Sequence, residues 1–175
     1  MKLTKKFFFI ILLLLISVNN LKAEDKIAYL DIDFILTNTL AGKLLLNQLK
    51  KEEDLKITQF KASDKDFKNK ESKILAKKNL ISNEEIKKEM KALQIEFKEY
   101  KNIKKQEFED LKNKRNKNII NFLNTINPII EKYMADNSIY ILLDKKNVFI
   151  ANNNFDITKK LIELIDNKIK TFEIK

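Results

Sequence analysis

The chain has 175 residues and a formal net charge of +10, and it contains neither cysteine nor histidine. The lack of cysteine excludes disulfide bonds, and the lack of both removes the usual zinc ligands and the commonest general base. One glycine and one proline in the whole chain argue against phosphate-binding loops and sheet-rich folds, which need glycine at tight turns. The composition therefore predicts one domain of mostly long helices, with no cofactor and no metal.

Residues 1–23 have the order of a secretory signal peptide. Lys2, Lys5 and Lys6 precede an apolar run of ten residues, 7–16, and a polar stretch then ends at Ala23. The alternative is an uncleaved membrane anchor, but ten apolar residues fall short of the roughly 20 that cross a bilayer. We expect export, with cleavage after Ala23.

Residues 24–49 should open the mature chain as the first part of a small β body. The segment 26–32 has the β-branched and aromatic residues of a strand, and Asp33 is expected to cap a short turn after it. A long helix should then begin near Leu40 and continue to about Leu80. The helix therefore leaves the body within the first third of the chain.

Residues 50–117 are predicted to form a helical hairpin arm with its tip near 81–83. There, Ser82 followed by Glu85 has the pattern of a capping box, which marks the start of a second helix. This helix should run to about Asp136. Two long helices joined by so short a break must run antiparallel.

The spacing of apolar residues predicts the seam between the two helices. Phe60, Phe67 and Ile74 lie one heptad apart, and the second helix has the 4-3-4-3 spacing of a coiled coil over 86–100. The register then slips over 103–108. We therefore expect a flexible arm rather than a rigid strut.

Residues 118–175 should complete the body. Pro128 lies inside the second helix, which it should kink or deprive of a hydrogen bond. A β-hairpin over 139–151 and a final helix over 157–169 are expected to follow. The strand 26–32 has to join that hairpin. Three short strands and a few helix ends make a very small core, so we expect the body to oligomerise.

Two stretches of the chain resemble the Skp (OmpH-like) family of periplasmic chaperones. They are KIAYLDIDFILTNTLAGKLLLNQL at 26–49 and INPIIEKYMADNSIYILLDKKNVFIANNNFDITKKLIELI at 126–165. The chain departs from the family where Asn137 or Ser138 replaces the usual glycine. The resemblance implies a mainly α, jellyfish-like homotrimer, in which hairpin arms project from a β-sheet oligomerisation core. It further implies a periplasmic protein that binds unfolded outer-membrane proteins and helps deliver them to the outer membrane, without ATP and without a catalytic step.

Three groups of residues are candidates for contacts with partners. Six large side chains of the arm are candidates for binding unfolded clients, or else simply hold the two helices together: Phe60, Phe67, Met90, Phe97, Tyr100 and Phe108. Six lysines near the tip are candidates for contact with anionic lipid, lipopolysaccharide or acidic clients, or else form a solvated face: Lys73, Lys77, Lys78, Lys87, Lys88 and Lys91. Six residues are candidates for the oligomerisation core: Ile27, Tyr29, Leu44, Ile141, Leu143 and Phe149.

Other functions fit the sequence less well. The alternative to a chaperone is a structural coiled-coil spacer or assembly adaptor of the envelope, which should show continuous heptads where this register slips. Nucleic acid is not expected as a physiological partner, because the chain has one arginine, Arg115, no recognisable binding module and an export signal. Asp31, Asp33 and Asp144 are more simply turn and cap residues than catalytic carboxylates.

Overall fold

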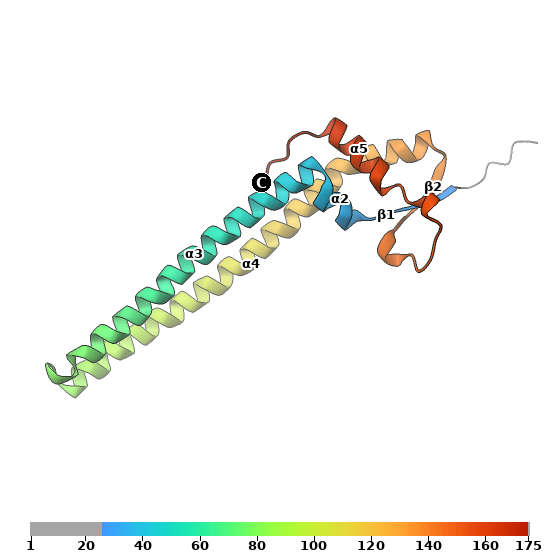
Figure 1. Ribbon diagram of the computed structural model, residues 1–175. Coiled ribbons are helices and arrows are strands. Elements are labelled where there is room, and N and C mark those ends of the chain that lie inside the picture. The colour runs from blue at the N-terminus through green and yellow to red at the C-terminus, as the bar shows by residue number, and fades with distance from the viewer. Residues whose placement is uncertain (1–25, 175) are drawn as a thin grey trace, which may run out of the picture.

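A computed structural model of the protein describes residues 26–174, which form a small body and one long two-helix arm (Figure 1). The predicted signal peptide, 1–23, lies outside the described residues. The elements in chain order are β1 (Lys26–Leu30), α2 (Ile32–Asn38), α3 (Leu40–Ala76), η2 (Lys77–Asn79), α4 (Asn83–Asp136), β2 (Ile139–Asp144), η3 (Lys145–Asn147), η4 (Asn153–Phe155) and α5 (Thr158–Lys168).

The arm is the antiparallel pair α3 and α4, and its tip is built as expected. Glu85 N donates to Ser82 Oγ at 3.2 Å, and Ser82 N donates to Glu85 Oε2 at 3.0 Å, so the capping box is present. α3 ends at Ala76 rather than at Leu80. The amide of Leu80 donates to the carbonyl oxygen of Lys77 at 2.8 Å, and such a bond between residues three apart tightens the last turn into a 3-10 helix.

α4 continues through Pro128 without a break. Proline lacks an amide proton, so the carbonyl of Asn124 loses its usual helical donor. Both Asn124 and Pro128 are exposed, and water can therefore take the place of that donor. The predicted cost at this proline is confined to one hydrogen bond on the solvent side.

The sheet of the body has two strands in the described residues, and they run parallel. Ile27 pairs with Ile141 and Leu30 with Asp144, with a register irregularity after Lys26. β1 ends at Leu30, earlier than expected, because the side chain of Asp31 accepts a hydrogen bond from Phe34 N at 2.8 Å and starts α2. Asp31 is thus the cap that the sequence assigned to Asp33.

The predicted hairpin over 139–151 is wrong within the chain. Its first half is β2, but the segment 148–151 contains no strand. The Asp144 carboxylate accepts a hydrogen bond from Lys146 N at 3.0 Å and thereby starts the 3-10 turn η3. A tight hairpin needs residues with positive φ at its turn, and among the described non-glycine residues Ser138 alone has one. The chain therefore turns away from β2 instead of folding back on it.

A left-handed residue follows the end of α4, and it is Ser138 rather than Asn137. Asn137 has φ −112° and Ser138 has φ 54°. Ser138 holds the conformation for which glycine is the usual residue, and it leads directly into β2. The α4–β2 junction is therefore made at some conformational cost.

The core of the body forms where the arm helices, α2 and α5 meet. The largest fully buried apolar side chains come from all four helices: Ile35, Leu45, Phe122, Ile126, Leu161 and Ile165. The amide of Ile157 donates to the carbonyl oxygen of Tyr29 at 3.0 Å and ties the start of α5 to β1. After α5 the chain returns beside α3, where Gln48 Nε2 donates to Phe172 O at 2.8 Å and the Phe172 ring lies 5.8 Å from that of Phe122.

Candidate functional site

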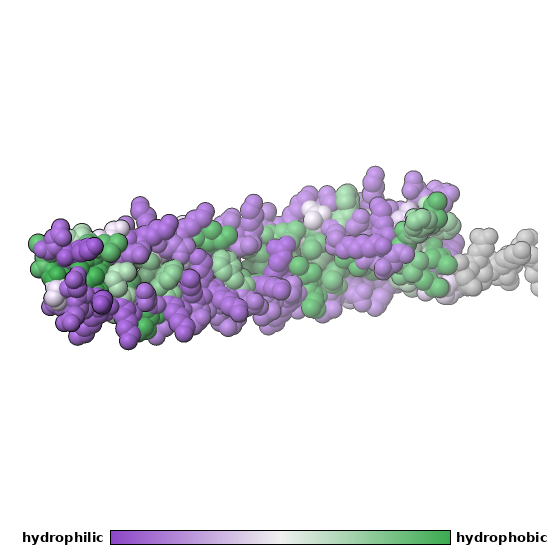
Figure 2. All heavy atoms as spheres, turned by 90° about the horizontal axis from the view of Figure 1, so that it is seen from below, coloured by the Kyte–Doolittle hydropathy of each residue, from purple (hydrophilic) through white to green (hydrophobic). Residues whose placement is uncertain are grey.

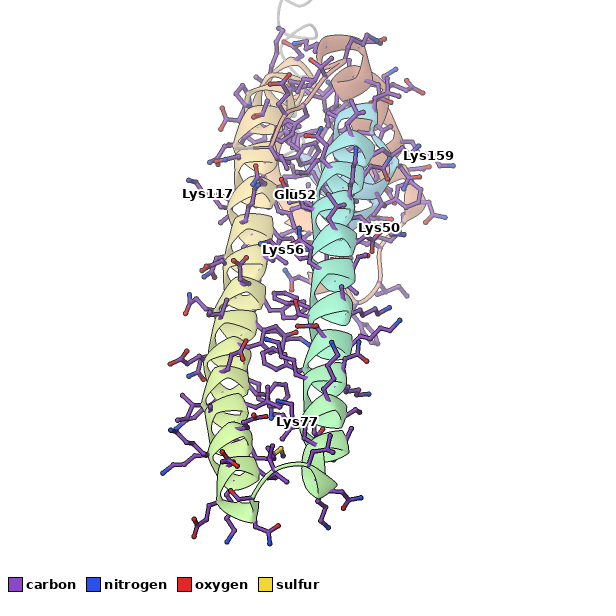
Figure 3. All side chains as sticks on the ribbon, turned by 90° about the vertical axis from the view of Figure 1, so that its left-hand side faces the viewer. Lys50, Glu52, Lys56, Lys77, Lys117 and Lys159 are labelled. Carbon is purple, nitrogen blue, oxygen red and sulfur yellow. The ribbon has the colours of Figure 1, made fainter. Side chains whose placement is uncertain are left out.

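Five predicted client-binding aromatics form one cluster between α3 and α4. Ring centroids lie 4.9 Å apart for Phe67 and Tyr100, 5.1 Å for Phe67 and Phe97, and 5.3 Å for Phe60 and Phe108. Figure 3 shows the side chains of the two helices meeting along this seam. Aromatic pairs at such separations contribute about 0.5–1.5 kcal/mol beyond the area they bury. The cluster therefore holds the arm together, as the simpler interpretation expects.

The cluster surrounds a polar network that the sequence did not suggest. Tyr100 Oη donates to Asp64 Oδ1 at 2.7 Å and to Phe60 O at 3.1 Å, and Lys104 Nζ donates to Asp64 Oδ2 at 2.8 Å. The bond from Lys104 is the main cause of a lowered pKa for Asp64, and the bond to Asp64 raises the pKa of Lys104. Burial is the main cause of a raised pKa for Tyr100. One feature of the sequence could have indicated this network: Lys104 lies four residues after Tyr100 and therefore on the same side of α4.

The predicted slip of register over 103–108 is wrong. Buried or half-buried positions of α4 continue with alternating steps of four and three residues: 86, 90, 93, 97, 100, 104, 107, 111, 114 and 118. Three seam positions that usually have an apolar residue such as leucine have a charged one instead: Lys104, Glu107 and Lys114. Ile103 and Phe108, which gave the impression of a slip, are exposed by 59% and 38%. The seam is continuous, and its part nearer the body is charged.

Those charged seam positions are paired across the arm. Ion pairs link α3 or η2 to α4 from near the body to the tip: Glu52–Lys114 at 2.7 Å, Lys56–Glu107 at 2.7 Å, Asp64–Lys104 at 2.8 Å, Lys70–Glu96 at 2.6 Å and Lys77–Glu89 at 2.9 Å. We call these pairs the ion-pair ladder, and Figure 3 labels three of its members, Glu52, Lys56 and Lys77. Exposed pairs contribute about 0–1 kcal/mol each. The ladder therefore closes the seam without making it strongly stable.

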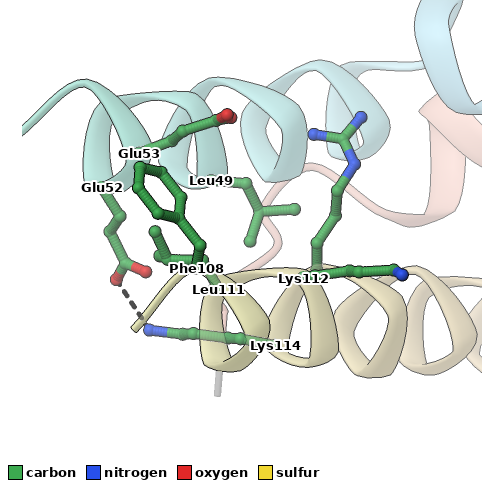
Figure 4. A pocket seen from close by; sticks show the side chains of 8 residues that line it. Leu49, Glu52, Glu53, Phe108, Leu111, Lys112 and Lys114 are labelled. Atoms are coloured by element: carbon green, nitrogen blue, oxygen red, sulfur yellow. Dashed lines mark hydrogen bonds and ion pairs between the residues drawn. The ribbon is translucent and has the colours of Figure 1, made fainter. Parts of the chain in front are cut away.

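Shallow grooves open on the arm beside the seam. The groove nearest the body, of about 170 Å³, is lined in part by Leu49, Phe108 and Leu111 (Figure 4). A groove of about 420 Å³ nearer the tip is lined by Phe67, Met90, Leu93 and Phe97 among others. Phe67, Phe97 and Phe108 thus belong to the seam cluster and also line a groove, which is compatible with both interpretations of the cluster.

The six candidate lysines near the tip are all exposed. Lys77 is held by Glu89 in the ladder, whereas the other five form no ion pair with any described residue. Two apolar side chains lie among them: Leu75 is 52% exposed and Leu80 is 82% exposed. Green atoms gather at the tip and at the body in Figure 2, with a mostly purple arm between them. The tip is both basic and apolar, a combination that the lysine pattern alone did not reveal.

The body exposes most of the residues assigned to the oligomerisation core. Ile27, Leu44, Ile141 and Leu143 are 40–50% exposed, and Phe149 is fully exposed. Tyr29 differs, because it is 6% exposed and lies in the core of its own chain. Sequence reasoning missed six further exposed apolar side chains of the body: Phe34, Leu40, Ile120, Tyr140, Ile150 and Phe155. So large an apolar surface on a small body marks a contact with another molecule.

Fold and surface together define a class: a long antiparallel coiled-coil arm mounted on a small body with an exposed apolar sheet. The chain belongs to the outer membrane protein (OmpH-like) family, which it matches over residues 26–165. Among solved structures, it is similar to a protein of Caulobacter crescentus CB15 named as a candidate outer membrane chaperone (OmpH-like). The TM-score is 0.76 at 19% identity, over 84% of this chain and 87% of that one. No curated protein matches the chain, and no helix among residues 26–174 is long and apolar enough to span a membrane.

Proposed function

We propose that the mature protein is an ATP-independent holdase of the periplasm, which binds unfolded outer-membrane proteins, prevents their aggregation and assists their delivery. The proposal includes export by residues 1–23 and cleavage after Ala23. It requires no catalytic step, and nucleic acid is not among the proposed partners. Membership of the OmpH-like family and the OmpH-like fold support a chaperone-like role.

The observation that carries the proposal is the set of aromatic-edged grooves along the arm. Unfolded barrel strands present alternating apolar side chains, and Phe67, Phe97 and Phe108 each line a groove that such side chains could enter. An arm whose seam is held in part by weak ion pairs can also adjust to clients of different shape. Binding would consist of many weak contacts rather than one deep pocket.

A homotrimer is part of this proposal. A single body of this size leaves Ile141, Leu143 and Phe149 in water, and packing against other copies would remove this surface from solvent. In that assembly, residues 24–49 and 118–175 of each copy would form the shared body. The segments 50–117 would project from it as arms around a cavity.

A second candidate, an envelope spacer or adaptor, is favoured by one specific observation. A spacer should have a continuous seam, and the seam over 86–118 is continuous. The charged residues within it, such as Lys104 and Glu107, make it less stable than an apolar seam would be. The exposed lysines of the tip could contact anionic lipid under either candidate function.

The two candidates are separated by a refolding assay. A denatured outer-membrane barrel protein is diluted out of urea without ATP, with and without the mature protein at stoichiometric trimer, and aggregation is followed by light scattering. A holdase suppresses the scattering, and a globular protein of equal charge serves as the control. If scattering is unchanged at stoichiometric trimer, the chaperone proposal is wrong and the spacer remains.

A further inference from the structure

Within α4, positive charge is concentrated on one side of the helix. Residues 50–117 carry 21 basic and 14 acidic side chains, and the excess is not evenly spread. Over residues 91–115, two columns of α4 at heptad intervals contain six cations and no acid: Lys91, Lys98, Lys105 and Lys112 in one, and Gln94, Lys101, Phe108 and Arg115 in the other. One heptad earlier the two columns have Glu84 and Lys87. Residues seven apart lie on the same side of a helix. We call these six cations the basic stripe.

The opposite side of α4 is acidic. Its two columns at the same intervals are Glu89, Glu96, Ile103 and Asp110, and Glu85, Ala92, Glu99 and Gln106. Five of these eight residues are acids and none is a cation, and Lys117 is the one cation that continues the first column. The seam lies between the two sides, so the arm has a basic side and an acidic side along the same length.

Contacts of individual residues agree with this division. Lys112 and Arg115 line the groove nearest the body, Lys68 lines the groove nearer the tip, and Lys101 Nζ lies 4.7 Å from the centre of the Phe97 ring. Another groove, on the acidic side, is lined by Leu55 and Asp110 among others. The two grooves with aromatic edges therefore open on the basic side.

The two sides also differ in how far their charges are already satisfied. Three acids at the acidic edge of the seam, Glu52, Glu89 and Glu96, are bonded to lysines of the ion-pair ladder. By contrast, no cation of the basic stripe forms an ion pair with any residue in 26–174. α3 adds a mixed rim to the basic side. Its charged residues are Glu52 and Glu53 at the groove nearest the body, and Asp64, Lys68 and Glu71 at the groove nearer the tip. The free charge that α4 presents beside the aromatic grooves is positive.

We propose that the basic side of the arm is the client-contact face, and that it takes unfolded segments in which an apolar stretch is flanked by carboxylates. The inference rests on the proposed holdase function. It adds which side of the arm contacts the client and which side chains the bound client segment has. Apolar side chains of an extended segment would enter the grooves at Phe97 and Phe108. Carboxylates that flank the apolar stretch would meet the cations beside the grooves, which are Lys112 and Arg115 near Phe108 and Lys101 near Phe97.

A polypeptide fits this face better than a lipid surface does. From Lys91 to Lys112 the stripe covers 21 residue steps, about 32 Å of helix at about 1.5 Å per residue. That is close to the length of a barrel strand of about 9–11 residues at about 3.3 Å each. One groove lies near each end of this length, at 90–97 and at 108–115 of α4, whereas a flat membrane would engage lysines without needing a groove beside them.

The test compares two triple variants of the full mature chain that lose the same charge. The stripe variant is Lys98→Gln, Lys105→Gln, Lys112→Gln. The control variant is Lys65→Gln, Lys73→Gln, Lys117→Gln, whose lysines lie on the back or the acidic side of the arm. All six are exposed and form no ion pair with any residue in 26–174, so helix content and thermal unfolding should match wild type.

Binding is measured by fluorescence anisotropy of a dye-labelled outer-membrane barrel protein diluted from urea. A second sample of the same client has its carboxylates blocked as amides, and vesicles of phosphatidylglycerol and phosphatidylcholine test the lipid alternative. We expect the stripe variant to bind the unmodified client about fivefold to thirtyfold more weakly, from three exposed charge contacts. The control variant should stay within about twofold of wild type. The blocked client should bind wild type and stripe variant equally.

Three results would overturn the face assignment. These are equal losses in both variants, no loss in either, or a stripe variant that loses vesicle binding while it keeps the client. In each case wild type still binds the client, so the holdase proposal stands. If wild type itself fails to bind the unmodified client, the holdase proposal fails, and the inference fails with it.

Discussion

Replacing the single glycine of the chain by alanine tests the packing where the arm leaves the body. Gly42 lies in the first turn of α3, buried against the end of α2. A Cβ at this position would fall on the carbonyl oxygen of Leu36, far inside van der Waals contact, and 2.8 Å from both the Leu36 carbonyl carbon and Thr39 Oγ1. Thr39 Oγ1 is also the acceptor of the Gly42 amide at 3.2 Å, which caps α3.

Two effects of opposite sign decide the result of Gly42→Ala. Alanine has the better helix propensity, by about 1 kcal/mol. Against this, inserting a methyl group into a packed site costs about 1–3 kcal/mol or more, and loss of a helix cap costs about 1 kcal/mol. Backbone atoms of Leu36 cannot rotate away as a side chain would, so α2 itself must shift. We expect a net loss of about 2 kcal/mol.

Thermal unfolding followed by circular dichroism at fixed protein concentration measures this loss. At this chain length, 1 kcal/mol corresponds to about 2–4 °C, so Tm should fall by about 4–8 °C. Lys43→Ala, at the adjacent exposed position, is the matched control and should leave Tm nearly unchanged. A Gly42→Ala protein as stable as wild type, or more so, would refute the reasoning, because helix propensity would then outweigh the contact with Leu36.

Three further predictions concern other parts of the chain. Phe122→Ala empties a fully buried site of the body core and should cost about 3–5 kcal/mol in urea unfolding. Ser138→Gly relieves a left-handed serine and should raise stability by about 0.5–1 kcal/mol in the same assay. Acid should loosen the arm, because hydrogen bonds from Lys104 and from Ser82 lower the pKa of Asp64 and of Glu85. Their contribution is complete above the ordinary carboxyl pKa of about 4 and is lost as pH falls through the lowered values.

Each of these expectations has a result that contradicts it. Phe122→Ala should be compared with Phe108→Ala, since Phe108 is 38% exposed, and equal losses would show that burial does not set the cost. A Ser138→Gly protein less stable than wild type would mean that serine is not strained there. Asp64→Asn with Glu85→Gln should flatten the fall in helix signal below about pH 4, and an unchanged pH profile would assign that fall to other carboxylates.

The helices could be predicted from local sequence because local chemistry determines their ends. The Ser82 capping box placed the start of α4 correctly, and the short break between two long helices predicted an antiparallel arm. The hairpin over 139–151 could not be predicted in this way. Its segment 148–151 is apolar enough for a strand, but the side chain of Asp144 starts a 3-10 turn and directs the chain elsewhere.

The candidate site was partly predictable for a related reason. Phe67, Phe97 and Tyr100 could be found because aromatic residues at seam spacing are visible in the sequence. Lys104 and Glu107 were missed because a charge at a seam position is normally read as the end of the seam. Only the partners across the arm, Asp64 and Lys56, explain how those charges are tolerated, and pairing between residues 40–51 positions apart has no local signal.

The ion-pair ladder has a consequence for how the arm closes again after its helices have been forced apart. In the native register Lys56 faces Glu107 and Glu52 faces Lys114. Sliding α4 by one heptad in one direction would bring Lys56 opposite Lys114, and sliding it in the other would bring Glu52 opposite Glu107. Aromatic side chains seven residues apart tolerate such a shift, whereas like charges repel. An arm that opens around large objects can therefore return to one alignment, because the misaligned alternatives are penalised at the end nearest the body.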